Sequence, residues 1–233
     1  NGLKEKAIDL YTVLVEREQD NPVWGNIITD LFGNIDDRLK FQKDAWEKDP
    51  QNEKKAKAFA STAIQASEWA MAVAPLEFLI SKEPENVGYL TQIGNVYNKL
   101  ENSTKSEEVF SKLISLEPAN RDHYFYFGKA LMEAGKYSQA RTQFLKASEV
   151  GGNWALPIFY EGFLYEQAAA GCTDFDRKVV YLLAQNTYRR ALNMDPALSE
   201  AKDRINALSG SVPTKEDYFF RGIKPGQSMP ITC

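Results

Sequence analysis

Few side chains in this sequence could carry out catalysis. His123 is the only histidine, and Cys172 and Cys233 are the only cysteines. A cysteine nucleophile needs a neighbouring base, so Cys172 or Cys233 would have to meet His123. His123 starts a predicted helix, Cys172 lies in a predicted turn at the edge of the fold, and nothing in the pattern brings them together. We therefore expect no enzyme, no catalytic residue, and an exposed or helix-capping His123.

Acidic residues beside Cys172 raise the question of a metal site. Asp174 and Asp176 follow this cysteine closely, and a thiolate with two carboxylates could bind a cation. However, Thr173 with Asp176 three residues later is the pattern of a helix N-terminal cap. The cysteines are not spaced as a metal clip, and the glycines do not cluster as in a phosphate-binding loop. We expect no metal and no cofactor, with a metal or catalytic role of these residues as the less favoured alternative.

Composition and charge argue against two classes of partner. The net charge is −4, from 28 basic and 32 acidic residues, and there is no basic run. A surface that follows nucleic-acid phosphates would need clustered positive charge. No stretch approaches the roughly 20 apolar residues that span a bilayer. We expect no nucleic acid and no membrane span, while the compartment stays open between the cytoplasm and export after removal of a signal peptide.

The elements that would position any site follow from an internal repeat. The segments "ISKEPEN" at 80–86 and "ISLEPAN" at 114–120 differ at two positions and place Pro84 and Pro118 34 residues apart. The same interval separates three glycines: Gly94, Gly128 and Gly162. A small residue follows twelve residues after each of the first two glycines: Ser106 and Ala140. Three markers in one register indicate a repeated structural unit.

Each unit reads as two helices joined by a tight turn. Tyr124, Phe127 and Leu131 recur at i, i+3 and i+7, which is one face of a helix. Gly135 follows as a helix stop, and the second helix places further residues on one face: Ala140, Phe144 and Ala147. Glycine or alanine at the marked positions would let the two helices approach closely.

At these residues the chain resembles the tetratricopeptide repeat family, whose 34-residue unit has a Leu-Gly-x-x-Tyr step, then alanine, an aromatic residue and proline. The first matching set is Ile93, Gly94, Tyr97, Ser106, Phe110, Leu113 and Pro118. The next is Phe127, Gly128, Leu131, Ala140, Phe144 and Ala147, and a later one is Gly162, Tyr165, Ala184, Tyr188, Ala191 and Pro196. The family's first-helix tryptophan is absent. The resemblance implies an all-α, right-handed superhelical solenoid of antiparallel helix pairs.

The register also predicts how the chain is divided. Four units of regular period are expected at 19–52, 53–86, 87–120 and 121–154, of which 19–52 is degenerate. A last pair at 155–198 carries a ten-residue insertion, because Gly162 and Ala184 are 22 residues apart instead of twelve. That insertion predicts a long second helix starting near Asp174. We expect residues 1–18 to be the second helix of a truncated preceding repeat, so that the chain begins inside a longer array, and 199–209 to be a closing helix.

Residues 210–233 form a Pro/Gly-rich aromatic tail that cannot continue the helices. We expect it to pack on the array through Tyr218, Phe219 and Phe220, in a turn capped by Thr214 and Asp217. The expected contact surface is the closing helix, around Ile205 and Leu208. The alternative is that the tail enters the concave groove as an internal pseudo-ligand.

The resemblance implies a non-catalytic scaffold that binds a peptide or protein partner in the concave groove lined by the first helices. Amides can satisfy a peptide backbone and aromatic side chains can anchor it. The expected partner-binding residues are Gln92, Asn95, Lys99, Phe125, Tyr126, Lys129, Phe159, Tyr160 and Phe163. Alternatively these aromatic residues are core, since Glu161 occupies the motif's leucine position and a rotated helix would turn them inward. The alternative function is a structural subunit of a larger assembly, or a regulatory domain of a longer protein.

One known mode of partner binding does not fit. Chaperone-adaptor members of the family hold a C-terminal carboxylate with lysine, asparagine and arginine at fixed places on successive first helices. Starting from Lys57, the remaining places carry Ser61, Gln92, Asp122 and Tyr126. We therefore expect no binding of chaperone tails by this clamp, and the partner's identity stays open.

Overall fold

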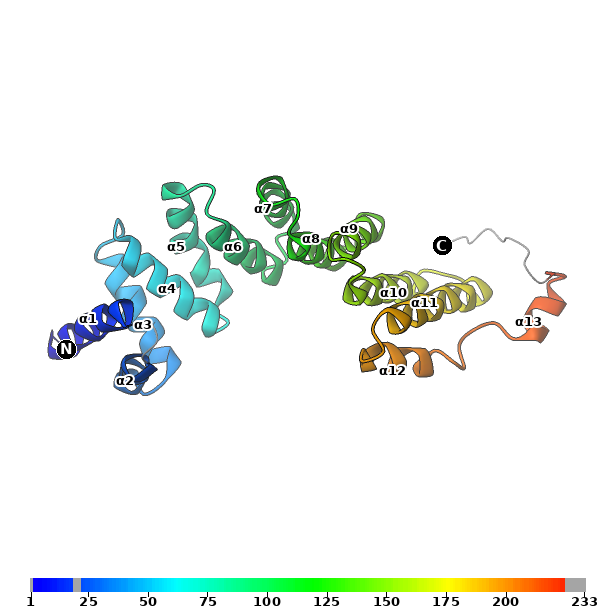
Figure 1. Ribbon diagram of the computed structural model, residues 1–233, viewed down its shortest axis with the longest axis horizontal. Coiled ribbons are helices and arrows are strands. Elements are labelled where there is room, and N and C mark those ends of the chain that lie inside the picture. Colours follow the sequence, from blue (N-terminus) through cyan, green and yellow to red (C-terminus); the bar gives the residue numbers. More distant parts are fainter. Residues whose placement is uncertain (1, 19–21, 225–233) are drawn as a thin grey trace. The chain divides into compact units, whose positions relative to one another are not determined.

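The computed structural model describes residues 2–18 and 22–224, and all regular secondary structure in these residues is α-helical (Figure 1). The chain divides into two compact units, Asn1–Leu100 and Glu101–Cys233. Unit 1 contains α1 (Gly2–Arg17), α2 (Pro22–Phe32), α3 (Ile35–Glu47), α4 (Glu53–Gln65), α5 (Trp69–Lys82) and α6 (Val87–Lys99). Unit 2 contains α7 (Ser103–Leu116), α8 (Arg121–Glu133), α9 (Tyr137–Val150), α10 (Ala155–Ala169), α11 (Asp174–Met194), α12 (Ser199–Ala207) and α13 (Lys215–Phe220). The all-α prediction is confirmed.

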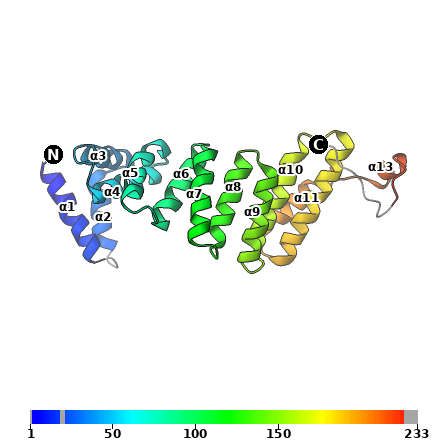
Figure 2. The same ribbon diagram turned by 90° about the horizontal axis from the view of Figure 1, so that it is seen from above.

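Helices that follow one another in sequence pack on one another. In unit 1, α3 packs on α4, α4 on α5 and α5 on α6. In unit 2 the same succession runs from α7 through α12, and α7 to α11 stand as a row of neighbours in Figure 2. Packing between successive elements is the pattern of a solenoid, in which no single hairpin buries its apolar face alone.

The repeated heptapeptide has a local structural role. Asn86 is the N-cap of α6 and accepts a hydrogen bond from the backbone N–H of Tyr89 at 3.1 Å, while its Nδ2 donates to Glu83 at 2.9 Å. Asn120 caps α8 and donates to Glu117 at 2.9 Å. The glutamate, proline and asparagine of each copy therefore form a turn that starts the next first helix, because the asparagine satisfies a backbone donor left free at the helix end.

The small residues of the repeat mark where two helices touch. A Cβ added to Gly128 would lie 2.7 Å from the ring of Phe144, and one added to Gly162 would lie 2.6 Å from the ring of Tyr188. Both rings are fully buried. The predicted close approach of α8 to α9 and of α10 to α11 is therefore present, and larger side chains at either glycine would force the pairs apart.

The ten inserted residues lengthen the last pair. Helix α11 has 21 residues and begins at Asp174, as the sequence predicted. The expected cap is different, because Thr173 makes no side-chain hydrogen bond to the helix end. Instead Arg177 donates to the carbonyl oxygens of Cys172 at 2.8 Å and of Ala169 at 3.3 Å. An arginine thus satisfies the end of α10 from the first turn of α11.

The tail contacts a different surface from the one expected. A capping box of Thr214 and Asp217 starts α13, as predicted. Asp217 then accepts from Lys178 Nζ at 2.9 Å on both carboxylate oxygens, and Tyr218 lies with its ring edge on Phe175, 5.9 Å between centroids. The short helix is therefore held at the start of α11.

Two corrections follow for the tail. Leu208 is buried and Ile205 half-buried in a cluster with Ala201 of α12 against α11, and the tail contacts Phe175 and Lys178 instead. Phe219 and Phe220 are not anchors, since they are 79% and 82% exposed. Residues 225–233, with Cys233, lie outside the described residues.

Candidate functional site

His123 and Cys172 are both buried. His123 is 3% exposed, and its Nε2 lies 2.9 Å from Glu117 Oε2 at the start of α8. A hydrogen bond from Asn120, and a second from His123, lower the pKa of Glu117. The expectation of an exposed His123 is wrong, because its side chain is buried where it meets Glu117 of the turn before α8. Cys172 is buried, lies 3.6 Å from the carbonyl of Ala168 and is not a free thiol.

Metal-binding clusters and membrane-spanning helices are both absent from the part of the chain that the structure describes. Among residues 2–18 and 22–224 there is no group of three or more histidine, cysteine, aspartate or glutamate side chains that could hold a metal ion. Asp174 and Asp176 lie in the first turn of α11. None of the helices described is both long and apolar enough to span a membrane.

The predicted partner residues of unit 1 share one face of α6. Gln92 and Lys99 are exposed and Asn95 is half-buried. Their spacing of three and four residues aligns them along the helix. This face offers amide and ammonium groups, and the half-buried Tyr89 precedes Gln92 by three residues.

Four of the predicted partner residues of unit 2 belong, together with Trp154, to a chain of ring contacts, here called the aromatic row: Phe125, Tyr126, Trp154, Phe159 and Tyr160. Phe125 of α8 lies 5.0 Å from Trp154 and 5.1 Å from Tyr160, measured between ring centroids. Tyr160 in turn meets Phe159 edge to face at 5.7 Å. These separations and tilts are those at which aromatic pairs attract one another.

Only part of the aromatic row is accessible. Phe125 is 6% exposed and belongs to the core cluster between α8, α9 and α10. The expectation that Phe125 is an exposed groove residue is therefore wrong. Trp154, at the start of α10, and Tyr160 of α10 contact its ring and cover it. Tyr126 is 37% exposed, whereas Phe159 and Tyr160 are half-buried.

Cations border the accessible side chains. Lys129 Nζ lies 5.7 Å from the ring centroid of Tyr160, and the Arg204 guanidinium lies 5.2 Å from that of Phe163. Burial, and then the charge of Glu133, raise the pKa of Tyr160, so its hydroxyl is neutral and can donate a hydrogen bond. Phe163 is thus partly covered, Lys129 is half-buried against Tyr160, and Tyr126 is exposed.

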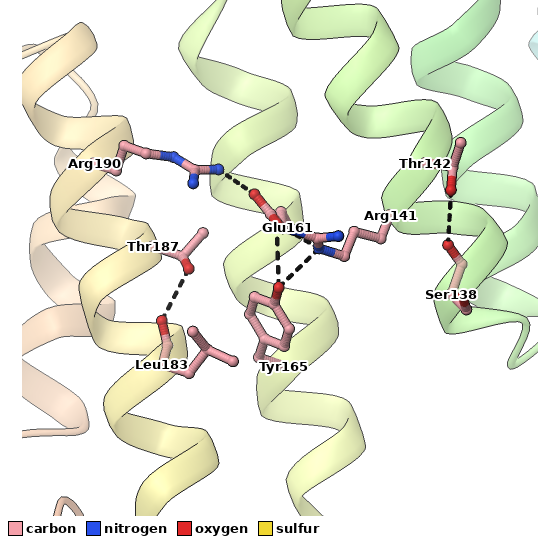
Figure 3. A network of polar contacts seen from close by, with 8 residues as sticks. All are labelled: Ser138, Arg141, Thr142, Glu161, Tyr165, Leu183, Thr187 and Arg190. Carbon is pink, nitrogen blue, oxygen red and sulfur yellow. Dashed lines mark hydrogen bonds and ion pairs between the residues drawn. The ribbon is translucent and has the colours of Figure 1, made fainter. Parts of the chain in front are cut away.

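A buried carboxylate joins the three helices α9, α10 and α11 (Figure 3). Glu161 of α10 is 1% exposed and accepts from Arg141 Nε of α9 at 2.7 Å and from Arg190 of α11. Tyr165 donates to the same carboxylate at 3.2 Å and accepts from Arg141 at 2.8 Å. Glu161 therefore replaces an apolar contact of the motif by an ionic bridge between successive helix pairs, and α10 keeps Ile158 and Leu164 in the core.

The structure also contains a hollow that the sequence did not indicate. This α7–α9 groove has a volume of about 590 Å³, and none of the predicted partner residues lines it. Its lining consists of Ser111, Ile114, Tyr124, Phe127, Thr142, Gln143, Leu145, Lys146 and Glu149. Most of these residues belong to second helices, to which the family resemblance assigns packing only, so no signal in the sequence marked them.

Comparisons with known proteins place the fold. Residues 87–120 match a family model described as Tetratricopeptide repeat. No curated protein matches the chain. Similar solved structures include MamA 41-end from Desulfovibrio magneticus RS-1, at 13% identity, 82% of this chain, 97% of that chain and a TM-score of 0.59.

Two further solved structures have the same architecture. YrrB, titled a TPR protein with an unusual peptide-binding site, has 17% identity, covers 83% of this chain and 96% of its own, and has a TM-score of 0.57. TTC0263, titled a thermophilic TPR protein in Thermus thermophilus, has 15% identity, covers 88% and 98%, and has a TM-score of 0.51. At such identities the likeness establishes the fold alone, a solenoid of helix pairs.

Proposed function

Because this chain carries a tetratricopeptide repeat at residues 87–120 and has the fold of tetratricopeptide repeat proteins, we propose that it is a non-catalytic scaffold that binds a protein or peptide partner. The partner lies on the first helices of unit 2. The observation that supports this most directly is the accessible end of the aromatic row, where Tyr126 is 37% exposed beside Lys129.

The aromatic row has the features of a recognition surface. Its buried member, Phe125, contacts the exposed ring of Tyr126 at 5.6 Å between centroids, so a partner meets a preorganised surface. Aromatic side chains with few rotatable bonds carry much of the energy in protein interfaces. Glu133 and Gln167 are exposed at the ends of α8 and α10 and provide a polar rim.

A peptide is the partner class to test first. YrrB is titled as having an unusual peptide-binding site, and its fold resembles that of this chain. The axes of neighbouring packed helices lie about 8–10 Å apart. An extended peptide advances about 3.3 Å per residue, so a short segment is long enough to contact both α8 and α10. In unit 1, the face of α6 with Gln92, Asn95 and Lys99 is a second, more polar contact region of the proposal.

The experiment first selects peptide ligands and then uses variants of the protein to locate where they bind. Peptides from a random display library are selected on the wild-type protein, and their affinities are measured by calorimetry. The variant Tyr126→Ala/Lys129→Ala should bind them about 30-fold more weakly, since truncation of an anchor costs about 2 kcal/mol.

A matched control carries Leu183→Ala/Lys202→Ala, which alters one apolar side chain of similar exposure, 39% for Leu183, and one exposed lysine elsewhere. Its affinity should stay within about threefold of wild type. Equal losses in the two variants, or none in the first, would rule out the aromatic row as the binding surface. The variant Gln92→Ala/Lys99→Ala tests the α6 face separately.

A further inference from the structure

Helix α13 presents two phenylalanine side chains to solvent. Phe219 and Phe220 are 79% and 82% exposed, and their rings contact each other at 5.7 Å between centroids. Single exposed apolar residues are ordinary, but two large adjacent ones form a patch that marks an interaction site. They are here called the phenylalanine pair.

The phenylalanine pair is held in a defined place. Asp217 is bonded both to the backbone N–H of Thr214, at 2.8 Å, and to Lys178 of α11. Arg221 lies over the ring of Phe175 at 4.2 Å, on the other side of the pair. A six-residue helix fixed at both ends loses little conformational freedom when its exposed side chains are bound.

The α7–α9 groove has the complementary chemistry. Its floor is apolar, with Ile114 of α7, Phe127 of α8 and Leu145 of α9, and its volume of about 590 Å³ is in the range of pockets that hold compact ligands. Its rim carries an ion pair of Lys146 and Glu149, 3.0 Å apart and 46% and 71% exposed.

Within one chain the pair and the groove are not joined. The groove is built on α7, α8 and α9, whereas α13 is fixed to the start of α11, and the phenylalanine pair stays exposed. We propose that the phenylalanine pair of one copy inserts into the α7–α9 groove of a second copy of this chain. Lys215 and Glu216, exposed beside the pair, match the opposite charges of Glu149 and Lys146 on the rim.

This contact joins two different surfaces, so each added copy leaves one pair and one groove free. Such a heterologous contact grows into rings or open chains rather than stopping at a dimer. It uses neither Tyr126 nor Lys129 and is therefore independent of the proposed partner surface. A membrane is the competing binder of exposed phenylalanine, but Glu216 and Asp217 in the same helix and a net charge of −4 oppose an anionic bilayer.

Sedimentation velocity over a concentration series up to about 200 µM, a range suited to weak interfaces, tests the proposal. The wild type should form species beyond the dimer. The variant Phe219→Ser/Phe220→Ser and the groove-filling variant Ser111→Trp should each stay monomeric, with unchanged circular dichroism. Two controls should associate as the wild type does: Leu183→Ser, and Glu108→Trp, an exposed site on α7 that does not line the groove.

Mixing the two inactive variants decides between this contact and any other. One supplies an intact groove and the other an intact pair, so the mixture should form dimers and nothing larger. A wild type that stays monomeric, a pair variant that associates normally, or a mixture without dimers would overturn the proposal. Monomeric wild type that sediments with phosphatidylserine–phosphatidylcholine vesicles, when the pair variant does not, would overturn it in favour of a membrane.

Discussion

Glu161 allows a sharp test of what holds successive helix pairs together. Its carboxylate is 1% exposed, while its two arginine partners are 48% and 50% exposed. Removing Arg141 and Arg190 together leaves a buried charge with only the Tyr165 hydroxyl as a partner. Removing Glu161 instead leaves two guanidinium groups that can turn into water.

The asymmetry predicts different losses of stability. The double variant Arg141→Ala/Arg190→Ala should lose about 3–5 kcal/mol, because a buried charge is left uncompensated. Glu161→Leu restores an apolar residue at the motif's leucine position and strands no charge, so it should stay within about 1 kcal/mol of wild type or exceed it. Glu161→Gln should lie between them, at a loss of about 1–3 kcal/mol, since it keeps the volume and loses charge-assisted hydrogen bonds.

Urea unfolding followed by circular dichroism measures these differences. With a slope of about 1–3 kcal/mol per molar urea, the double variant should shift the midpoint by more than about 1 M. Arg189→Ala is the matched control, because Arg189 is exposed on α11 and donates to Gln185 and Asn186 of its own helix. If Glu161→Leu is less stable than the double arginine variant, the argument from stranded charge is refuted.

Three other predictions concern local contacts. Gly162→Ala should lose about 1–3 kcal/mol, because its Cβ would lie 2.6 Å from a buried tyrosine ring, whereas Gly210→Ala, with no atom within 4 Å, should change the urea midpoint little. The hydrogen bond from the Thr214 backbone, together with Lys178, lowers the pKa of Asp217 to about 2. Its contribution to holding α13 is therefore complete above the ordinary aspartate pKa and is lost as the pH falls towards 2; carboxyl-carbon NMR should show that titration, and Lys178→Ala should move it upward. Asn86→Ala should lower stability by about 1 kcal/mol through loss of the α6 cap, and an unchanged thermal midpoint would contradict this.

The repeat could be recognised from the sequence because its signals are local. Each helix is encoded by apolar residues three, four and seven positions apart. Each close approach of two paired helices is marked by a glycine, which can be recognised without knowing the residue that it faces. The long α11 was also predictable, since an insertion changes a spacing that can be counted. In the sequence, Asn86 was recognisable only as a residue repeated in both heptapeptides. The structure shows that it caps α6 and donates to Glu83.

The accessible surface could not be predicted in the same way. Phe125 and Tyr126 are adjacent and chemically alike, yet the first is 6% exposed and the second 37%. The difference arises because Trp154 and Tyr160, at the start of α10 and within it, contact and cover the ring of Phe125. His123 is likewise buried by a turn that contacts it through Glu117.

By itself, then, the sequence determined the helical units, their period and the small residues between paired helices, because these depend on neighbours within one turn or one hairpin. Tertiary structure decided which aromatic rings are exposed, where α13 is held and which hollow lies between α7 and α9. Those properties depend on which side chains of different helices meet. The periodicity of one helix does not predict which side chains of the neighbouring helices contact it.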